Sequence, residues 1–146
     1  QKLSETGKYT VSDRVLRAVQ AEFSCGFCTD AQGAQTIGRT FRENHYLLDT
    51  HTAVACTVLD AYRAGTGDQT LTVVESTASP FKFCASVLDA LGVTEHAPGT
   101  GVLGQLTAET GRPAPTPLAS LAGKPVRFDQ VTDRGDMRAV VTEFLR

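Results

Sequence analysis

The sequence has 146 residues, with 14 basic and 16 acidic side chains and a formal net charge of −2. This balanced charge without a basic stripe argues against partners such as nucleic acid or an anionic membrane, and the longest apolar runs are far shorter than a bilayer span. Four cysteines without a secretory leader predict free thiols in a cytoplasmic protein.

The first half of the chain predicts a polar, extended lead-in over residues 1–10 and then three helices. Apolar residues recur at helical spacing in three groups: Val15, Leu16, Val19 and Phe23; Ala34, Ile37 and Phe41; Val54, Val58 and Tyr62. Good N-cap residues precede each group: Ser12 or Asp13, Thr29 or Asp30, and Asp49 or Thr50. The third helix is expected to stop at residues 65–67.

The central stretch combines a predicted strand with a predicted helix. Residues 71–75 are apolar and β-branched, as in a strand that fills a sheet. Ser79 is a good N-cap, and Pro80 suits the first helical position of a helix whose apolar face is Phe83, Val87, Leu88 and Leu91. Ser76 and Thr77 therefore lie between a strand end and a helix start, where open α/β sheets bind ligands.

The last third is richer in glycine and proline. Residues 93–123 form a loop-rich region with a short helix near 102–109, and residues 124–131 predict a second strand. A final helix carries Met137, Val140, Val141 and Phe144. Two strands alone are only marginally stable, and the chain begins with Gln1, so we expect it to be a piece of a longer polypeptide without an internal domain boundary.

Residues 99–104 match the Gly-x-Gly-x-x-Gly pattern of dinucleotide-binding loops. That function requires a preceding strand and an acidic residue about 20 positions further on. Residues 96–98 do not form a strand pattern, and the region near Leu121 contains no acid. We therefore interpret this motif as a glycine loop ahead of a short helix.

Cys25 and Cys28 form a Cys-x-x-Cys pair. It could be a redox pair, or half of a zinc site completed by Cys56, Cys84 or a histidine. A redox pair belongs at a helix start after a strand, but this pair follows a helix. Zinc usually takes two closely spaced pairs, but Cys56 and Cys84 are isolated. Structural free thiols, with no metal, are the preferred interpretation.

Three residues are candidates for binding. His51 lies in the first turn of a helix, where the helix dipole favours a neutral ring that could orient a ligand or another loop. A hydrogen-bonded structural corner is the alternative. Ser76 and Thr77 are too weakly acidic to act as general acids unaided, and no nucleophile elbow surrounds them. They could donate a neutral hydrogen bond to a ligand or cap the following helix.

Four segments resemble the C-terminal part of the threonine synthase family, and they follow one another in the same order as in that family. These segments are residues 7–12, 46–55, 76–83 and 124–127. The His-Thr-Ala and Ser-Thr-Ala-Ser-Pro sequences are the most specific of them. Many relatives have Ala-His-Pro where this chain has Ala-Ser-Pro at residues 78–80, a variation that leaves Thr77 in register. The family does not usually carry Cys-x-x-Cys in the turn after the first helix.

The resemblance implies a fold class. It is a helix-rich, C-terminal part of an α/β fold-type II pyridoxal-phosphate enzyme, a three-layer αβα architecture of which this chain contributes few strands. It also implies that the full enzyme converts O-phospho-L-homoserine and water into L-threonine and phosphate. Thr77 matches the residue whose hydroxyl meets the pyridine nitrogen of pyridoxal phosphate. Ser76 is a second candidate for the cofactor, and His51 is a candidate for the substrate.

The family's Schiff-base lysine and phosphate loop belong to the N-terminal part, so the resemblance implies no catalytic residue in this chain. Lys82 does not stand in the cofactor-lysine context. The isolated chain is therefore expected to be inactive, to need the N-terminal remainder as its partner, and to associate with itself when alone. The alternative hypothesis is a stand-alone ligand-binding or thiol-active module.

Overall fold

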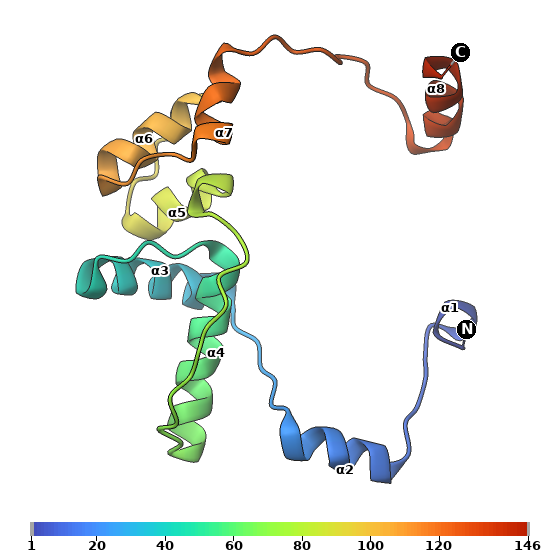
Figure 1. The fold of residues 1–146 in the computed structure, drawn as a ribbon, viewed down its shortest axis with the longest axis vertical. Coiled ribbons are helices and arrows are strands. Elements are labelled where there is room, and N and C mark those ends of the chain that lie inside the picture. Colours follow the sequence, from blue (N-terminus) through green and yellow to red (C-terminus); the bar gives the residue numbers. More distant parts are fainter. Residues whose placement is uncertain (1, 146) are drawn as a thin grey trace.

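The computed structural model describes residues 2–145, and every secondary-structure element within them is helical (Figure 1). The elements are α1 (Lys2–Thr6), α2 (Asp13–Glu22), α3 (Asp30–Asn44), α4 (Thr50–Thr66), the 3-10 turn η1 (Pro80–Lys82), α5 (Cys84–Leu91), α6 (Gly101–Thr110), α7 (Thr116–Ala119), η2 (Ser120–Gly123), η3 (Arg134–Asp136) and α8 (Met137–Phe144). The helix-rich expectation is confirmed. Among these helices, none has both the length and the apolar character that crossing a bilayer requires.

The two predicted strands are wrong as secondary structure. Residues 71–75 and 124–131 have no strand assignment, and the side chains of Leu71 and Val131 are each 94% exposed. A strand exists only through backbone hydrogen bonds to a neighbouring strand, and neither stretch forms such pairing bonds with another described segment. The prediction of an extended conformation over residues 1–10 is also only partly correct, because α1 occupies Lys2–Thr6.

The helix ends follow the capping residues. Ser12, Thr29 and Asp49 are the N-caps of α2, α3 and α4, and the side chain of each accepts a backbone hydrogen bond in the first turn. Thr29 and Gln32 form a reciprocal capping box. Gly67 ends α4 in a left-handed conformation, with φ at 72°. These boundaries were therefore within reach of sequence reasoning.

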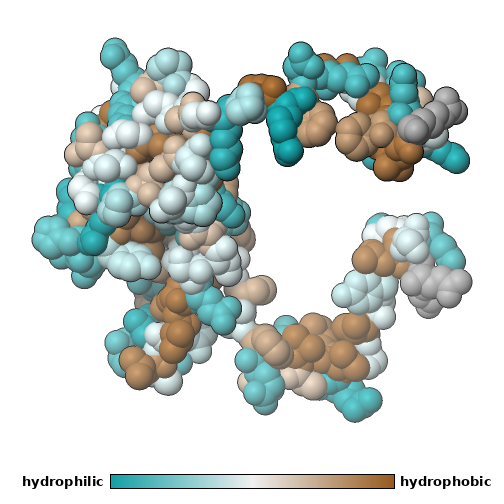
Figure 2. Space-filling view, turned by 45° about the horizontal axis from the view of Figure 1, so that its top comes forward, coloured by the Kyte–Doolittle hydropathy of each residue, from teal (hydrophilic) through white to brown (hydrophobic). Residues whose placement is uncertain are grey.

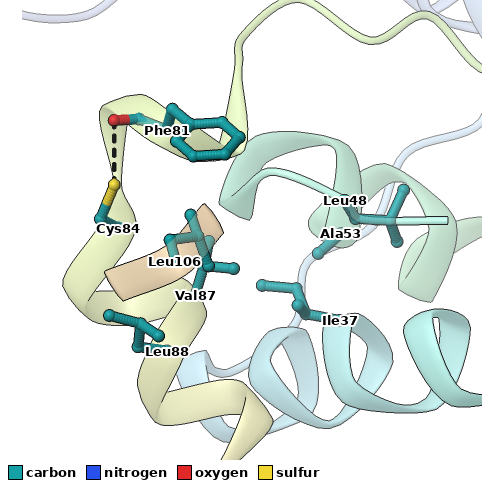
Figure 3. Packing of buried hydrophobic residues seen from close by; sticks show 8 residues of the cluster. All are labelled: Ile37, Leu48, Ala53, Phe81, Cys84, Val87, Leu88 and Leu106. Carbon is teal, nitrogen blue, oxygen red and sulfur yellow. Dashed lines mark hydrogen bonds between the residues drawn. The ribbon is translucent and has the colours of Figure 1, made fainter. Parts of the chain in front are cut away.

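A small apolar core joins α3, α4, η1, α5 and α6 (Figure 3). Its buried members are Ile37, Leu48, Ala53, Phe81, Cys84, Val87, Leu88 and Leu106. The predicted apolar face of α5 is confirmed at Val87 and Leu88, which are fully buried. The thiol of Cys84 donates to the carbonyl oxygen of Phe81 at 3.2 Å and so joins η1 to α5. This core fixes the N-terminal end of α4 relative to η1, where the candidate site lies.

Two arms leave this body in Figure 1, one carrying α1 and α2 and the other carrying α8. Neither α2 nor α8 contains a buried residue. The predicted apolar face of α2 exists, but it is exposed: Leu16 is 45% and Phe23 is 73% accessible. Figure 2 shows apolar surface over both arms. The amphipathic pattern thus predicted the helices correctly but gave no partner for their apolar faces.

Candidate functional site

The side chain of Asp49 brings Ser76 to the N-terminus of α4. One carboxylate oxygen, Oδ1, accepts from the backbone N–H groups of His51 at 2.9 Å and Thr52 at 3.3 Å. The other, Oδ2, accepts from the hydroxyls of Thr52 and, at 3.3 Å, Ser76. Thr52 Oγ1 also lies 3.1 Å from Ser76 Oγ. Asp49, Thr52 and Ser76 therefore form one connected group, here called the Asp49 cluster.

The Asp49 carboxylate is buried and ionised. Its side chain has no accessible surface. Burial raises the pKa of Asp49, but the hydrogen bonds from Thr52, His51 and Ser76 together outweigh burial and hold that pKa below its ordinary value. A carboxylate in this state is a fixed negative acceptor at the positive end of a helix. It orders its neighbours and is a poor proton donor.

Thr77 differs from Ser76 in how its hydroxyl is used. Its side chain is exposed, and it makes no hydrogen bond to any residue that the structure describes. Ser76, one residue earlier, is held by the Asp49 cluster. The two adjacent hydroxyls that the sequence left equivalent therefore lie in different surroundings, one engaged by the protein and one available to a ligand.

The imidazole of His51 packs against Phe83, with ring centroids 5.0 Å apart and planes tilted by 50°. Its Nδ1 lies 3.3 Å from Thr50 Oγ1 and 3.5 Å from the Asp49 carboxylate, and 61% of its side chain is accessible. His51 and Phe83 line an open groove of about 650 Å³ between α3, α4 and α5. The ring is thus fixed on one side by its neighbours and open to the groove on the other.

The four cysteines do not converge. Cys25 is exposed, Cys28 is half-buried, and all four are free thiols. Within residues 2–145 no group of three or more metal-binding side chains is arranged to hold an ion. Burial raises the pKa of the Cys56 and Cys84 thiols, which makes them weak nucleophiles.

The glycine motif at residues 99–104 opens α6, as the structural interpretation predicted. Residues 93–97 before it are not a strand. The side chain of Gln105 anchors this loop, because its oxygen accepts from the Ala97 N–H at 2.8 Å and its amide donates to the Glu95 carbonyl at 2.7 Å. The loop therefore lacks the strand on which dinucleotide binding depends.

Sequence reasoning recognised Asp49 as a helix cap but missed its contact with Ser76, 27 residues away. Thr52 was noted only as part of the His-Thr-Ala sequence and was given no role of its own. The available signal was local: a capping aspartate followed three residues later by a hydroxyl, and a second hydroxyl pair at the start of the next helical segment. Their meeting depends on the packing of η1 and α5, which no spacing in the sequence reveals.

Comparisons with known proteins agree on one family. The family model described as "Threonine synthase, C-terminal" matches residues 52–142. Mouse threonine synthase-like 1 is 33% identical over 82 residues, which are 56% of this chain and 10% of the mouse protein. Threonine synthase from Saccharomyces cerevisiae is 28% identical over 96 residues, which are 62% of this chain and 19% of the yeast protein.

A solved structure agrees as well. The crystal structure of PLP-bound threonine synthase from Brucella melitensis matches with a TM-score of 0.55 and 33% identity, over 77% of this chain and 22% of that one. The chain thus spans between a tenth and a quarter of the length of these relatives. The match to the family model covers Thr77, α4 from Thr52 onward, and the helices α5, α6 and α7. The chain belongs to the threonine synthase C-terminal family.

Proposed function

We propose that this chain is the C-terminal part of a pyridoxal-phosphate-dependent threonine synthase of fold type II. The longer enzyme would convert O-phospho-L-homoserine and water into L-threonine and phosphate. The observation that carries this proposal is the family match across residues 52–142, which includes the available hydroxyl of Thr77. Support for the cofactor comes from the PLP-bound relative at 33% identity.

Thr77 fits a role at the pyridine nitrogen. Its hydroxyl is neutral, exposed and uncommitted among the described residues. When bound, pyridoxal phosphate supplies an electron sink for carbanion chemistry on amino acids. A neutral hydroxyl does not require the pyridine to be protonated, whereas a carboxylate partner would favour the protonated ring. Thr77 would therefore hold the ring in place without increasing its capacity to withdraw electrons.

We assign Ser76 a supporting role beside Thr77, because the Asp49 cluster already engages its hydroxyl. His51 is our candidate for a contact with the substrate. Its ring is fixed by Phe83 and Thr50 on one side and open to the groove on the other. An imidazole held in this way could orient a phosphate or carboxylate group without changing its own position.

The rest of the machinery would come from the N-terminal remainder of the same polypeptide. Lys82 is exposed in η1, outside the sequence context of a cofactor lysine. The exposed apolar faces of α2 and α8 and the unpaired segment at residues 71–75 offer this remainder a large apolar surface. We infer that the 146 residues alone are inactive. The four free thiols support a reducing compartment, the cytoplasm.

The experiment begins with the encoding reading frame and the intact mass of the natural protein. The longer polypeptide is then tested with pyridoxal phosphate for phosphate release from O-phosphohomoserine. Thr77→Ala should shift the visible absorbance of the bound cofactor and slow turnover by about tenfold or more, whereas Thr77→Ser should retain both properties. Thr94→Ala, an exposed threonine in the loop after α5, is the matched control. No phosphate release from the unmodified polypeptide would refute the proposed reaction.

A further inference from the structure

The segment between α4 and η1, residues 67–79, has few anchors to the helical body. Leu71 and Val73 do not hold it in place, because they are 94% and 86% exposed. Near its start, the Arg63 guanidinium donates to the Thr70 carbonyl at 3.0 Å and to Thr72 Oγ1 at 3.2 Å. Near its end, the hydroxyl of Ser76 joins the Asp49 cluster, and the hydroxyl of Ser79 accepts from the Phe81 N–H of η1 at 3.3 Å.

Asp49 is well suited to be the fixed end of that anchor. Both of its oxygens are occupied, Oδ1 by two backbone N–H groups of the first turn of α4 and Oδ2 by two hydroxyls. The preceding residue, Leu48, is part of the apolar core. A buried carboxylate that caps a 17-residue helix cannot move without breaking the cap. Any group bonded to Oδ2 therefore takes its position from α4.

We propose that Asp49 is a positioning residue that acts through Ser76 to fix the hydroxyl of Thr77. Consecutive Cα atoms are 3.8 Å apart, so holding Ser76 restricts where Thr77 can lie. Sites of this kind need side chains held to within about 0.5 Å. This inference deepens the proposed function and rests on it for the role of Thr77, but the restraint on the segment can be measured without any cofactor.

The first test uses the longer polypeptide without pyridoxal phosphate and measures backbone order by 15N relaxation. Asp49→Ser keeps a hydroxyl that can cap α4 but is too short to reach Ser76, and Ser76→Ala removes the hydroxyl that contacts both Asp49 and Thr52. Both should lower the order parameter at Thr77 from about 0.85 to below about 0.6. Asp68→Asn is the matched control, since Asp68 organises the opposite end of α4 through Thr70 and Tyr62. Unchanged order at Thr77 in both variants overturns the proposal.

The second test is a double-mutant cycle in the longer polypeptide with pyridoxal phosphate. Asp49→Ser should lower kcat about tenfold, leave KM within about twofold, and shift the cofactor absorbance as Thr77→Ala does. In the Thr77→Ala background, Asp49→Ser should have almost no further effect on kcat, because the hydroxyl that Asp49 positions is already absent. An equal loss of kcat in both backgrounds shows a merely structural Asp49 and overturns the proposal. If the longer polypeptide without substitutions is inactive, the proposed function is refuted. The relaxation measurement alone then decides whether Asp49 positions Thr77.

Discussion

Gly38 of α3 lies directly against the backbone of Ala90 in α5. A Cβ built on Gly38 would come within 2.6 Å of the Ala90 carbonyl oxygen and 3.0 Å of the Arg42 guanidinium. The arginine could move aside, but the carbonyl belongs to a helix whose Val87 and Leu88 are fully buried. The absence of a side chain at Gly38 therefore allows α3 and α5 to pack closely.

Gly38→Ala should consequently destabilise the chain. Alanine gains about 1 kcal/mol of helix propensity, but steric overlap in a packed interface costs about 1–3 kcal/mol. We expect a net loss of free energy of unfolding, measured by urea titration. Gly65→Ala is the control within α4, because a Cβ there meets nothing within 4 Å. It should stabilise the chain by about 0.5–1 kcal/mol. If both substitutions stabilise it, the close approach of α3 and α5 is wrong.

The contribution of Asp49 to stability should depend on pH. Because the folded chain lowers the pKa of Asp49, folding favours the ionised carboxylate. The resulting stabilisation is complete above the unfolded pKa of about 3.9 and is lost as the pH falls through the lower, folded pKa. The difference in free energy of unfolding between wild type and Asp49→Asn should thus be larger at pH 6 than at pH 3. A difference that grows on acidification would contradict this assignment.

Replacing both Cys25 and Cys28 by serine should have little effect. Neither belongs to the apolar core, and the described residues offer them no metal site. Activity of the longer polypeptide should change less than twofold, and the melting temperature of the chain should not respond to reductant or chelator. Cys84→Ser is the contrasting variant, since Cys84 is buried in the core beside Phe81. Chelator-induced unfolding of the wild type would revive the zinc alternative.

The helix boundaries could be predicted from the sequence because they depend on neighbouring residues. Thr29 with Gln32 and Asp49 with Thr52 act within one helical turn, so the information lies in four consecutive residues. The prediction of a strand at residues 71–75 was wrong for the opposite reason. Their β-branched pattern describes a strand, but a strand needs a second segment to pair with, and within residues 2–145 none forms backbone hydrogen bonds with this stretch.

The candidate site likewise has features that could be predicted from neighbouring residues and features that could not. His51 and Thr77 could be singled out from sequence motifs, whereas the bond from Ser76 to Asp49 joins residues 27 positions apart and depends on the tertiary structure. Gly38 is a related case. Its helix-weakening effect is visible in the sequence, but the reason for the glycine, the carbonyl of Ala90, is not.

The apolar faces of the two arms should make the 146-residue chain associate with itself. The side chains of Val19 and Phe23 on α2 are 48% and 73% exposed, and Phe144 on α8 is 72% exposed. Each Å² of apolar surface that is removed from water contributes about 25 cal/mol of favourable free energy. These faces therefore favour contact between copies when no other partner covers them. Sedimentation velocity should show a weight-average mass that rises with concentration. Val19→Ser combined with Phe23→Ser should reduce this association without lowering the melting temperature, because α2 contains no buried residue. Ile37→Ser, in the core, should instead unfold the chain. A wild-type chain that stays monomeric at every concentration would show that the exposed faces of the arms do not drive association.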